Sequence, residues 1–325
     1  MVPMWVNTLV NPGQFVHGQM AAPDASSLDQ GQVIVRFVCG AVCGSDLPKF
    51  RGKADRGDYG PYDGYPLHEV VGEVVETRSA ALSLGDRVVG FAAEARGMRE
   101  YFVTSDNYMI PVKSSVSDRD LVVVQSLATV LSALSRVGTA SSRHVSGRHA
   151  AVIGQGPLGL LWAHVLKSQG AEHVTGVDQV DRTWAASAFS VDEPVWASSS
   201  DWSGSLRDEA RPDLVVEAVG HEVGTLNDAI QALAPEGVIV AFGVPDDPYY
   251  PVAFVDLFRK NASLVTGVTK DWPRFLGEAL SYLERHPALA GSYITHEFSV
   301  ADVQKAYECA ARPVSRRLKV VLASR

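Results

Sequence analysis

The amino-acid sequence predicts an α/β protein of two domains, a mostly antiparallel β domain and a doubly wound parallel-sheet domain. The chain has 325 residues, and a single hydrophobic core rarely grows past about 250 to 300 residues. Residues 1–121 hold short valine-rich runs separated by turn residues. The residues that follow alternate strand-like and helix-like runs, which is the βαβ pattern of a parallel sheet.

In the first domain we expect strands where apolar or alternating runs lie between Gly, Pro, Asp and Ser. These runs are Val33–Val38, Val70–Glu76, Arg87–Phe91 and Glu100–Val103. β-branched residues favour a pleated, half-buried surface, and the turn residues interrupt it. Short runs of this kind are typical of an antiparallel sheet.

In the second domain strands and helices are expected to alternate. The expected strands are 150–153, 173–178, 213–219, 237–243 and 263–268, and the expected helices are 121–137, 157–169 and 224–233. Two more helices, at 272–285 and 300–311, precede a terminal strand at 318–322 that could pair with the first domain. We therefore expect a discontinuous β domain, 1–121 with 269–325, around a parallel-sheet domain, 122–268.

The composition is that of a globular protein and excludes several classes. Hydrophobic residues make up 46% and charged residues 20%, which is enough apolar material for a core and too little charge for disorder. The net charge is -8 and the basic residues are scattered, so nucleic acid is not an expected partner. The first basic residue is Arg36, and no apolar run approaches the roughly 18 to 20 residues that a bilayer requires. We expect a cytoplasmic protein without membrane contact.

A G-x-G-x-x-G motif, Gly154-Gln155-Gly156-Pro157-Leu158-Gly159, follows an apolar strand and opens a helix. In such a motif the glycines permit a tight turn, close approach of a pyrophosphate and close helix packing, and the helix N-terminus stabilises the phosphate charge. A plain structural turn would explain the motif alone. The order of strand, motif, helix, second strand and then Asp178, about 20 residues further on, favours a cofactor site. Because the Asp178 carboxylate can bind ribose hydroxyls and would repel a 2'-phosphate, we expect NAD in preference to NADP.

Further cofactor contacts are expected from loops at the ends of the sheet strands. Arg182 follows Asp178, and four residues end the later strands: Val219, Gly220, Gly243 and Val244. Parallel sheets present ligand-facing loops at these ends. The neighbouring His221 fits either a ligand contact or an ordinary loop.

The first domain contains Cys43-Gly44-Ser45-Asp46 and, further on, His68-Glu69. Taken singly, Cys43 suits a small buried hydrophobe and His68 a hydrogen-bonded core histidine. With the glycine motif they resemble the zinc-dependent alcohol and polyol dehydrogenases of the medium-chain dehydrogenase/reductase superfamily. The likeness extends to Gly85-Asp86-Arg87-Val88, Val216-Glu217-Ala218-Val219-Gly220 and Ile294-Thr295-His296. It implies a GroES-like catalytic domain, a Rossmann domain and an active-site cleft between them.

The resemblance also implies roles for the residues of the first domain. Cys43 and His68 would be zinc ligands, and Glu69 would be either the third protein ligand or a neighbour that exchanges with water. A catalytic zinc needs about three protein ligands and one open position. Asp46 would bind the other ring nitrogen of His68 and fix its tautomer. Ser45 would take the substrate proton, although a turn-stabilising hydroxyl is an alternative.

Two departures from the family pattern concern the metal. Polyol-type relatives carry Glu-Pro-Leu where this chain has Gln125-Ser126-Leu127, and a neutral amide is a poor zinc ligand. Either water completes the site or the metal is bound more weakly. The four-cysteine structural zinc lobe is replaced by residues 91–99, and the three cysteines of the chain, Cys39, Cys43 and Cys309, can form neither that site nor a disulfide framework. We expect one catalytic zinc ion and no structural zinc.

The sequence predicts an NAD-dependent oxidoreductase that interconverts a secondary alcohol or cyclic polyol and its ketone by zinc-assisted hydride transfer. A zinc-free NADPH-dependent enone or quinone reductase and a non-catalytic dinucleotide-binding protein are the alternatives. The resemblance implies a homodimer or homotetramer. The segment Lys49–Pro66 suits either a substrate entrance or a solvated loop, and Trp272 and Tyr108 suit either a pocket or a core.

Overall fold

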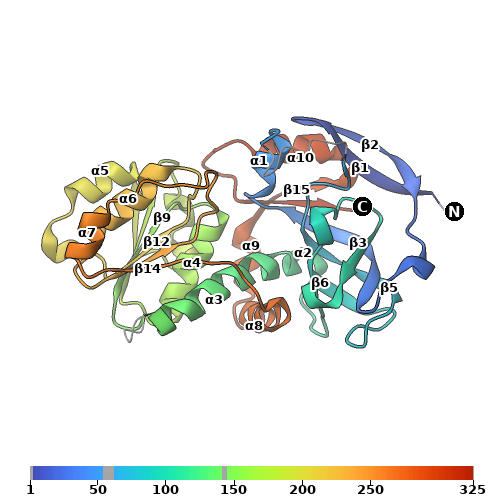
Figure 1. The fold of residues 1–325 in the computed structure, drawn as a ribbon, viewed down its shortest axis with the longest axis horizontal. Coiled ribbons are helices and arrows are strands. Elements are labelled where there is room, and N and C mark those ends of the chain that lie inside the picture. The colour runs from blue at the N-terminus through green and yellow to red at the C-terminus, as the bar shows by residue number, and fades with distance from the viewer. Residues whose placement is uncertain (1–2, 54–61, 141–144, 325) are drawn as a thin grey trace. The chain divides into compact units, whose positions relative to one another are not determined.

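The computed structural model describes residues 3–53, 62–140 and 145–324, without the side chains of 62, 139 and 140. It divides into two compact units (Figure 1). Unit 1 consists of Met1–Ala128, Lys270–Pro313 and Arg317–Arg325, and unit 2 of Thr129–Thr269 and Val314–Arg316. The first boundary between the units follows Ala128, whereas the sequence analysis expected it after residue 121. The short segment Val314–Arg316 belongs to unit 2, although it lies within the expected second part of the first domain. Arg56 and Tyr59 of the segment 49–66 lie outside the described residues.

Unit 1 contains two β-sheets among the described residues. The smaller has the order β2-β1-β4, with β1 (Pro3–Asn11), β2 (Gln14–Ala21) and β4 (Tyr62–Asp63). The larger has the order β15-β16-β3-β5-β6-β8, with β7 also paired to β3. Its strands are β3 (Gln32–Val42), β5 (Glu69–Thr77), β6 (Arg87–Phe91), β7 (Tyr101–Ser105), β8 (Met109–Pro111), β15 (Ile294–Ser299) and β16 (Lys319–Ala323). Every pair in it is antiparallel except β15 with β16, which confirms the mostly antiparallel prediction.

The C-terminal part of the chain returns to unit 1, as the sequence predicted. Strand β16 pairs with β3, so the end of the chain completes the sheet that its beginning started. The helices of this unit are α1 (Asp46–Phe50), α2 (Asp118–Leu121), α8 (Trp272–Arg285), α9 (Ala288–Tyr293) and α10 (Val303–Ala310). Helix α10 packs Val303 and Tyr307 into the same buried cluster as Val35 and Val70 of the sheet. Helix α3 (Val123–Ala140) begins in unit 1 and ends in unit 2.

Unit 2 is built on a six-stranded parallel sheet of the order β11-β10-β9-β12-β13-β14. The strands are β9 (His149–Ile153), β10 (His173–Asp178), β11 (Glu193–Trp196), β12 (Leu214–Glu217), β13 (Val238–Ala241) and β14 (Ser263–Val265). Counted from β9, this is the 3-2-1-4-5-6 order of dinucleotide-binding sheets. The doubly wound prediction is therefore confirmed.

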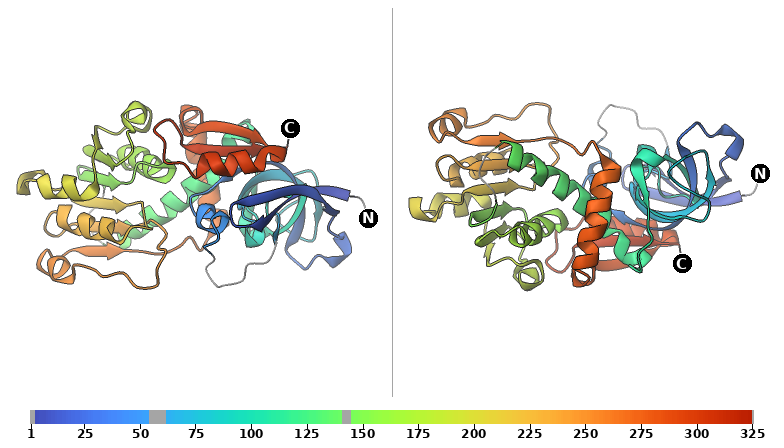
Figure 2. Two further views of the ribbon diagram at one scale, coloured as in Figure 1. Left: turned by 90° about the horizontal axis from the view of Figure 1, so that it is seen from above. Right: turned by 90° about the horizontal axis from the view of Figure 1, so that it is seen from below.

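Helices cover both faces of this sheet (Figure 2). On one face α5 (Ser199–Ser205), α6 (Val223–Ala232) and α7 (Phe254–Arg259) bury Trp202, Ile230 and Leu257 in one cluster with Ile153 of β9. On the other face α4 (Pro157–Ser168) lies against β9 and β10. Alternate residues of the strands thus point to opposite helical layers, so the strands are apolar on both sides.

One stretch of the described residues, Asp118–Gly138, is long and apolar enough to cross a bilayer. However, 67% of its most apolar window is buried in the protein. Core helices of globular proteins have the same length and composition, so burial explains the apolar character of this stretch.

Candidate functional site

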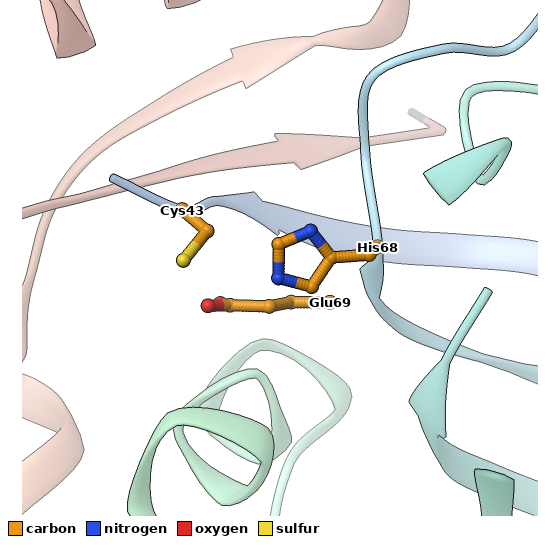
Figure 3. Close-up of side chains that lie close together, drawn as sticks. All are labelled: Cys43, His68 and Glu69. Atoms are coloured by element: carbon orange, nitrogen blue, oxygen red, sulfur yellow. The ribbon is translucent and has the colours of Figure 1, made fainter. Parts of the chain in front are cut away.

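Three side chains of unit 1, all of types that bind metal ions in proteins, lie together at neighbouring strand ends. Cys43 follows the last residue of β3, His68 precedes β5 and Glu69 begins it. Register pairing of Ala41 with Glu69 holds the two strands side by side at this point. One ligand atom from each of Cys43, His68 and Glu69 lies within 4.8 Å of the others. Figure 3 shows the sulfur, the imidazole and the carboxylate pointing toward one common space.

Asp46 connects two of these residues. Its Oδ1 atom lies 2.9 Å from Nδ1 of His68, and its Oδ2 atom accepts a 3.0 Å hydrogen bond from the backbone N–H of Cys43. Asp46 is fully buried. The predicted hydrogen bond to His68 is present, and a proton on Nδ1 leaves the Nε2 lone pair for a metal ion. Although burial lowers the pKa of His68, the Asp46 carboxylate raises it, to well above its ordinary value.

Glu69 is held by a lysine from the far end of the chain. Nζ of Lys319 donates a 2.7 Å hydrogen bond to Oε1 of Glu69 and lies 2.6 Å from Oε2. The hydroxyl of Ser126 donates a 3.1 Å hydrogen bond to the same Oε1. Burial lowers the pKa of Lys319, but Glu69 raises it above its ordinary value. Both side chains are almost completely buried, at 3% and 1% exposed.

The donor set fits a divalent metal ion. Both carboxylate oxygens of Glu69 lie beside Lys319, since Oε1 accepts its hydrogen bond and Oε2 lies 2.6 Å from its Nζ. A thiolate, an imidazole and a carboxylate are ligands that zinc binds, and three protein ligands leave one open position. Gln125 is buried at 4% exposed, and within the described ranges no further His, Cys, Asp or Glu joins the group.

Ser45 lies just before α1 and directly precedes Asp46 in the sequence. It is partly exposed, and its side chain makes no capping hydrogen bond to the helix N-terminus. The proton-accepting role expected for Ser45 stays a prediction.

Sequence reasoning missed Lys319 and Ser126. Lys319 is the charged residue in the apolar run Leu318-Lys319-Val320-Val321-Leu322, and a charge inside a buried strand signals a paired group. Ser126 stands in the segment that departs from the family pattern. That segment drew attention to Gln125, whereas its neighbour is the residue that contacts Glu69.

The glycine motif of unit 2 has the geometry of a phosphate-binding turn. Gly154 has φ +89°, a conformation that favours glycine, and a Cβ atom on Gly159 would lie 1.7 Å from the Gly154 carbonyl oxygen. A Cβ atom on Gly156 would meet nothing within 4 Å. Pro157 and Leu158 follow as the first residues of α4. The space above Gly156 and the helix N-terminus suit a pyrophosphate, so these residues fit a dinucleotide.

Asp178 ends β10 beside this turn. Its two carboxylate oxygens accept 2.7 Å hydrogen bonds from the backbone N–H groups of Gln155 and Val180. The carboxylate lines a small cavity beside β10 and β11. Arg182 also lines this cavity, but its guanidinium donates to the carbonyl oxygens of Val314 and Ser315.

The loops after β12 and β13 touch through their glycines. A Cβ atom on Gly220 would lie 2.4 Å from Val244 N, and one on Gly243 would lie 2.2 Å from Gly220 N. Glu217 accepts hydrogen bonds from the backbone N–H groups of Val219 and Gly220. The four residues expected to contact the cofactor thus form two loops in direct contact. His221 is exposed, and its Nδ1 lies 3.0 Å from Val219 O in its own loop.

Fold and site together are those of a two-domain nicotinamide-dependent dehydrogenase whose first unit carries a group of metal-ligand residue types. Residues 122–322 match the family model described as glucose dehydrogenase C-terminus, and residues 29–114 match the alcohol dehydrogenase GroES-like domain. The chain belongs to the medium-chain dehydrogenase/reductase superfamily, as the sequence motifs indicated, and it is an oxidoreductase.

Its relatives include dehydrogenases that match over most of their length. Sorbitol dehydrogenase of Halalkalibacterium halodurans is 25% identical over 85% of this chain and 87% of that protein. D-altritol 5-dehydrogenase of Agrobacterium fabrum is 26% identical over 90% of this chain and 92% of that protein. Among solved structures, alcohol dehydrogenase TADH from Thermus sp. ATN1 superimposes with a TM-score of 0.84, at 23% identity, over 99% of this chain and 100% of that one. The last likeness shows the shared fold.

Proposed function

We propose that this protein is an NAD-dependent, zinc-dependent dehydrogenase that interconverts a secondary alcohol or cyclic polyol and its ketone. The observation that carries the proposal is the convergence of Cys43, His68 and Glu69 on one space. The printed names of the relatives, which include sorbitol and altritol dehydrogenases, support the polyol class.

Each residue of the metal site has a defined part. Cys43, His68 and Glu69 would hold one zinc ion, which when bound supplies a Lewis acid that lowers the pKa of an alcohol oxygen. Asp46 keeps the proton of His68 on Nδ1 and so orients the imidazole. Ser45 Oγ receives the proton of the substrate hydroxyl and passes its own proton to water.

Two hydrogen-bond donors, Lys319 and Ser126, affect how strongly Glu69 can bind the metal. Lys319 neutralises the buried carboxylate through a hydrogen bond, and Ser126 donates to the same Oε1. Both oxygens lie beside Lys319, so the proposal assigns the metal to the Glu69 carboxylate as a whole and not to one of its oxygens. Residues Gln125 and Phe91–Arg99 supply no ligand, so we propose one catalytic ion and no structural ion.

The cofactor of unit 2 is proposed to be NAD. Two backbone N–H groups fix the Asp178 carboxylate, whose charge repels a 2'-phosphate. Arg182, which would otherwise attract that phosphate, directs its guanidinium to the Val314 and Ser315 carbonyls. The expected contacts of Val219, Gly220, Gly243 and Val244 with the cofactor remain part of the proposal.

The proposal includes a cytoplasmic homodimer or homotetramer. Strand β14 is an edge of the parallel sheet, and its Leu264 is 41% exposed. Phe254 and Phe258 of α7 are 70% and 74% exposed. An apolar edge strand beside exposed rings is a surface that proteins pair or cover. Leu264→Glu is expected to yield monomers in light scattering, while an unchanged mass would remove β14 from the interface.

The function is tested with purified protein, a metal analysis and a panel of secondary alcohols and cyclitols. We expect about one zinc per chain and NADH formation that a chelator abolishes and zinc restores. Cys43→Ala should retain NAD binding and lose hydride transfer. Cys309→Ala is the matched control, because Cys309 is a partly buried free thiol that lies outside the metal group.

Three results would contradict the proposal. Protein without zinc that reduces enones with NADPH would be a zinc-free reductase. NAD binding with no turnover of any alcohol or ketone would exclude the proposed substrate class. Equal catalytic efficiency with NAD and NADP would contradict the role given to Asp178.

A further inference from the structure

Three aromatic side chains of unit 1 lie beside the metal site, where Phe91 contacts His68 and both of the other rings. The ring centroid of Phe91 lies 4.7 Å from that of His68, with 30° between the planes. Trp272 and Tyr108 lie 5.7 Å and 5.9 Å from Phe91. All of these separations fall within the range of interacting aromatic pairs. We call Phe91, Trp272 and Tyr108 the aromatic wall.

Regular structure holds each ring in place. Phe91 is the last residue of β6 and pairs in register with Glu69, so the backbone that positions a metal ligand also positions this ring. Trp272 begins α8, where the Asp271 side chain caps the helix. Tyr108 ends the 3-10 helix Asp106–Tyr108, which contacts α8. Three separate elements therefore converge on Phe91.

The aromatic wall connects a buried site with solvent. His68 is 6% exposed, Phe91 and Trp272 are partly buried, and Tyr108 is 38% exposed. Among the described residues, the buried cluster that contains Val35 and Tyr307 does not include any of the three rings. Large apolar side chains that stay partly exposed beside a buried polar site are typical of a ligand-binding surface.

We infer that the aromatic wall selects substrates whose reacting hydroxyl is carried on a ring rather than on an open chain. This inference rests on the proposed function of the metal site. The face of an aromatic ring is electronegative, and carbon atoms that bear hydroxyl groups have C–H bonds polarised toward positive. A cyclic alcohol presents several such C–H groups on one face, as a rigid surface that covers Phe91 while its hydroxyl reaches the site beside His68.

An open-chain alcohol with the same numbers of carbons and hydroxyls loses more conformational entropy when it makes this contact. It must give up rotation about several carbon–carbon bonds to lie flat against the rings, and lost rotation opposes binding. The wall thus discriminates by shape and stiffness, independently of how many hydroxyl groups the substrate carries.

The test compares matched pairs of alcohols with the zinc- and NAD-loaded protein. myo-Inositol and sorbitol have equal numbers of carbons and hydroxyls, as do cyclohexanol and 2-hexanol. In whichever pair the protein oxidises, we expect kcat/KM to be about tenfold higher for the cyclic member, with most of the difference in KM. Trp272→Ala and Phe91→Leu should each reduce about tenfold the ratio of cyclic to open-chain kcat/KM measured on the same variant, whatever the absolute rates become.

Controls separate this inference from folding and from the proposed function. Tyr249→Ala removes an 87% exposed aromatic ring of unit 2 and should leave the preference unchanged. Calorimetric binding of cyclohexanone and 2-hexanone to the NADH complex should show the same selectivity without turnover. A preference for open-chain alcohols, or one that survives in both folded wall variants, overturns the inference. Absence of NADH formation from every alcohol contradicts the proposed function itself.

Discussion

Replacement of Lys319 by methionine should strongly destabilise the metal-free protein, and zinc should recover part of the loss. Lys319 and Glu69 are 3% and 1% exposed and lie 2.6 Å apart. Methionine has nearly the same length but no charge, so the variant leaves a carboxylate buried without its cation. Among the described residues, the hydrogen bond that the Glu69 carboxylate still accepts is the 3.1 Å contact from the Ser126 hydroxyl.

The size of this effect follows from the burial of both partners. Removal of one member of a buried ion pair typically costs about 3 to 5 kcal/mol, because the other charge has lost its solvent and its partner. Zinc bound beside Glu69 supplies a replacement positive charge. We therefore expect the full loss in the presence of a chelator and a smaller one with saturating zinc.

The assay is urea unfolding of the full chain with and without zinc, followed by hydrogen exchange of the backbone amides of unit 1. The control is the double variant Lys319→Met with Glu69→Gln, in which both charges are absent. In chelator it should be more stable than Lys319→Met alone, and the double-mutant cycle measures the coupling. Stability of Lys319→Met within about 1 kcal/mol of wild type, far below the expected cost of an unpaired buried charge, would refute this reasoning. So would a double variant as unstable as the single one.

Three further predictions concern other parts of the chain. Asp46→Asn should lower zinc affinity by about 10- to 100-fold, since it weakens the hydrogen bond that orients His68; competition with a chromogenic chelator measures this, and unchanged affinity would contradict it. Gly159→Ala should disrupt the turn and abolish NAD binding in calorimetry, because its Cβ would lie 1.7 Å from a carbonyl oxygen; wild-type affinity would show that the turn adapts. Burial, and next the neighbouring His173, lower the pKa of His149. The unfolded chain therefore takes up a proton that the folded protein resists, and stability should fall as pH drops below about 6.5, through the lowered folded pKa. Thermal unfolding of His149→Gln should show a smaller loss between neutral and acidic pH, and an identical loss would exclude this histidine.

Local sequence signals predicted the elements whose formation is local. The predicted bounds of β10, His173–Asp178, and of α8, Trp272–Arg285, agree with the structure. In α8, Asp271 caps the first turn, and apolar residues recur at helical spacing. The sequence analysis did not predict the N-terminal hairpin Pro3–Ala21, or the strands β11 and β15. Strand β11 is four residues long, contains Pro194 and lies at a sheet edge, so only its pairing with β10 makes it a strand.

The sequence by itself determined the chemistry available to this protein. Cys43, His68 and Glu69 supply zinc-type ligands, and the glycine motif with Asp178 supplies a dinucleotide site, because such functions depend on residue types at short spacings. Only the tertiary structure decided what surrounds those ligands. Lys319 reaches Glu69 across a separation of 250 residues because β16 pairs with β3. The aromatic wall likewise joins Phe91 to Trp272, which begins a helix far along the chain, and no local pattern encodes contacts that arise when distant segments pack together.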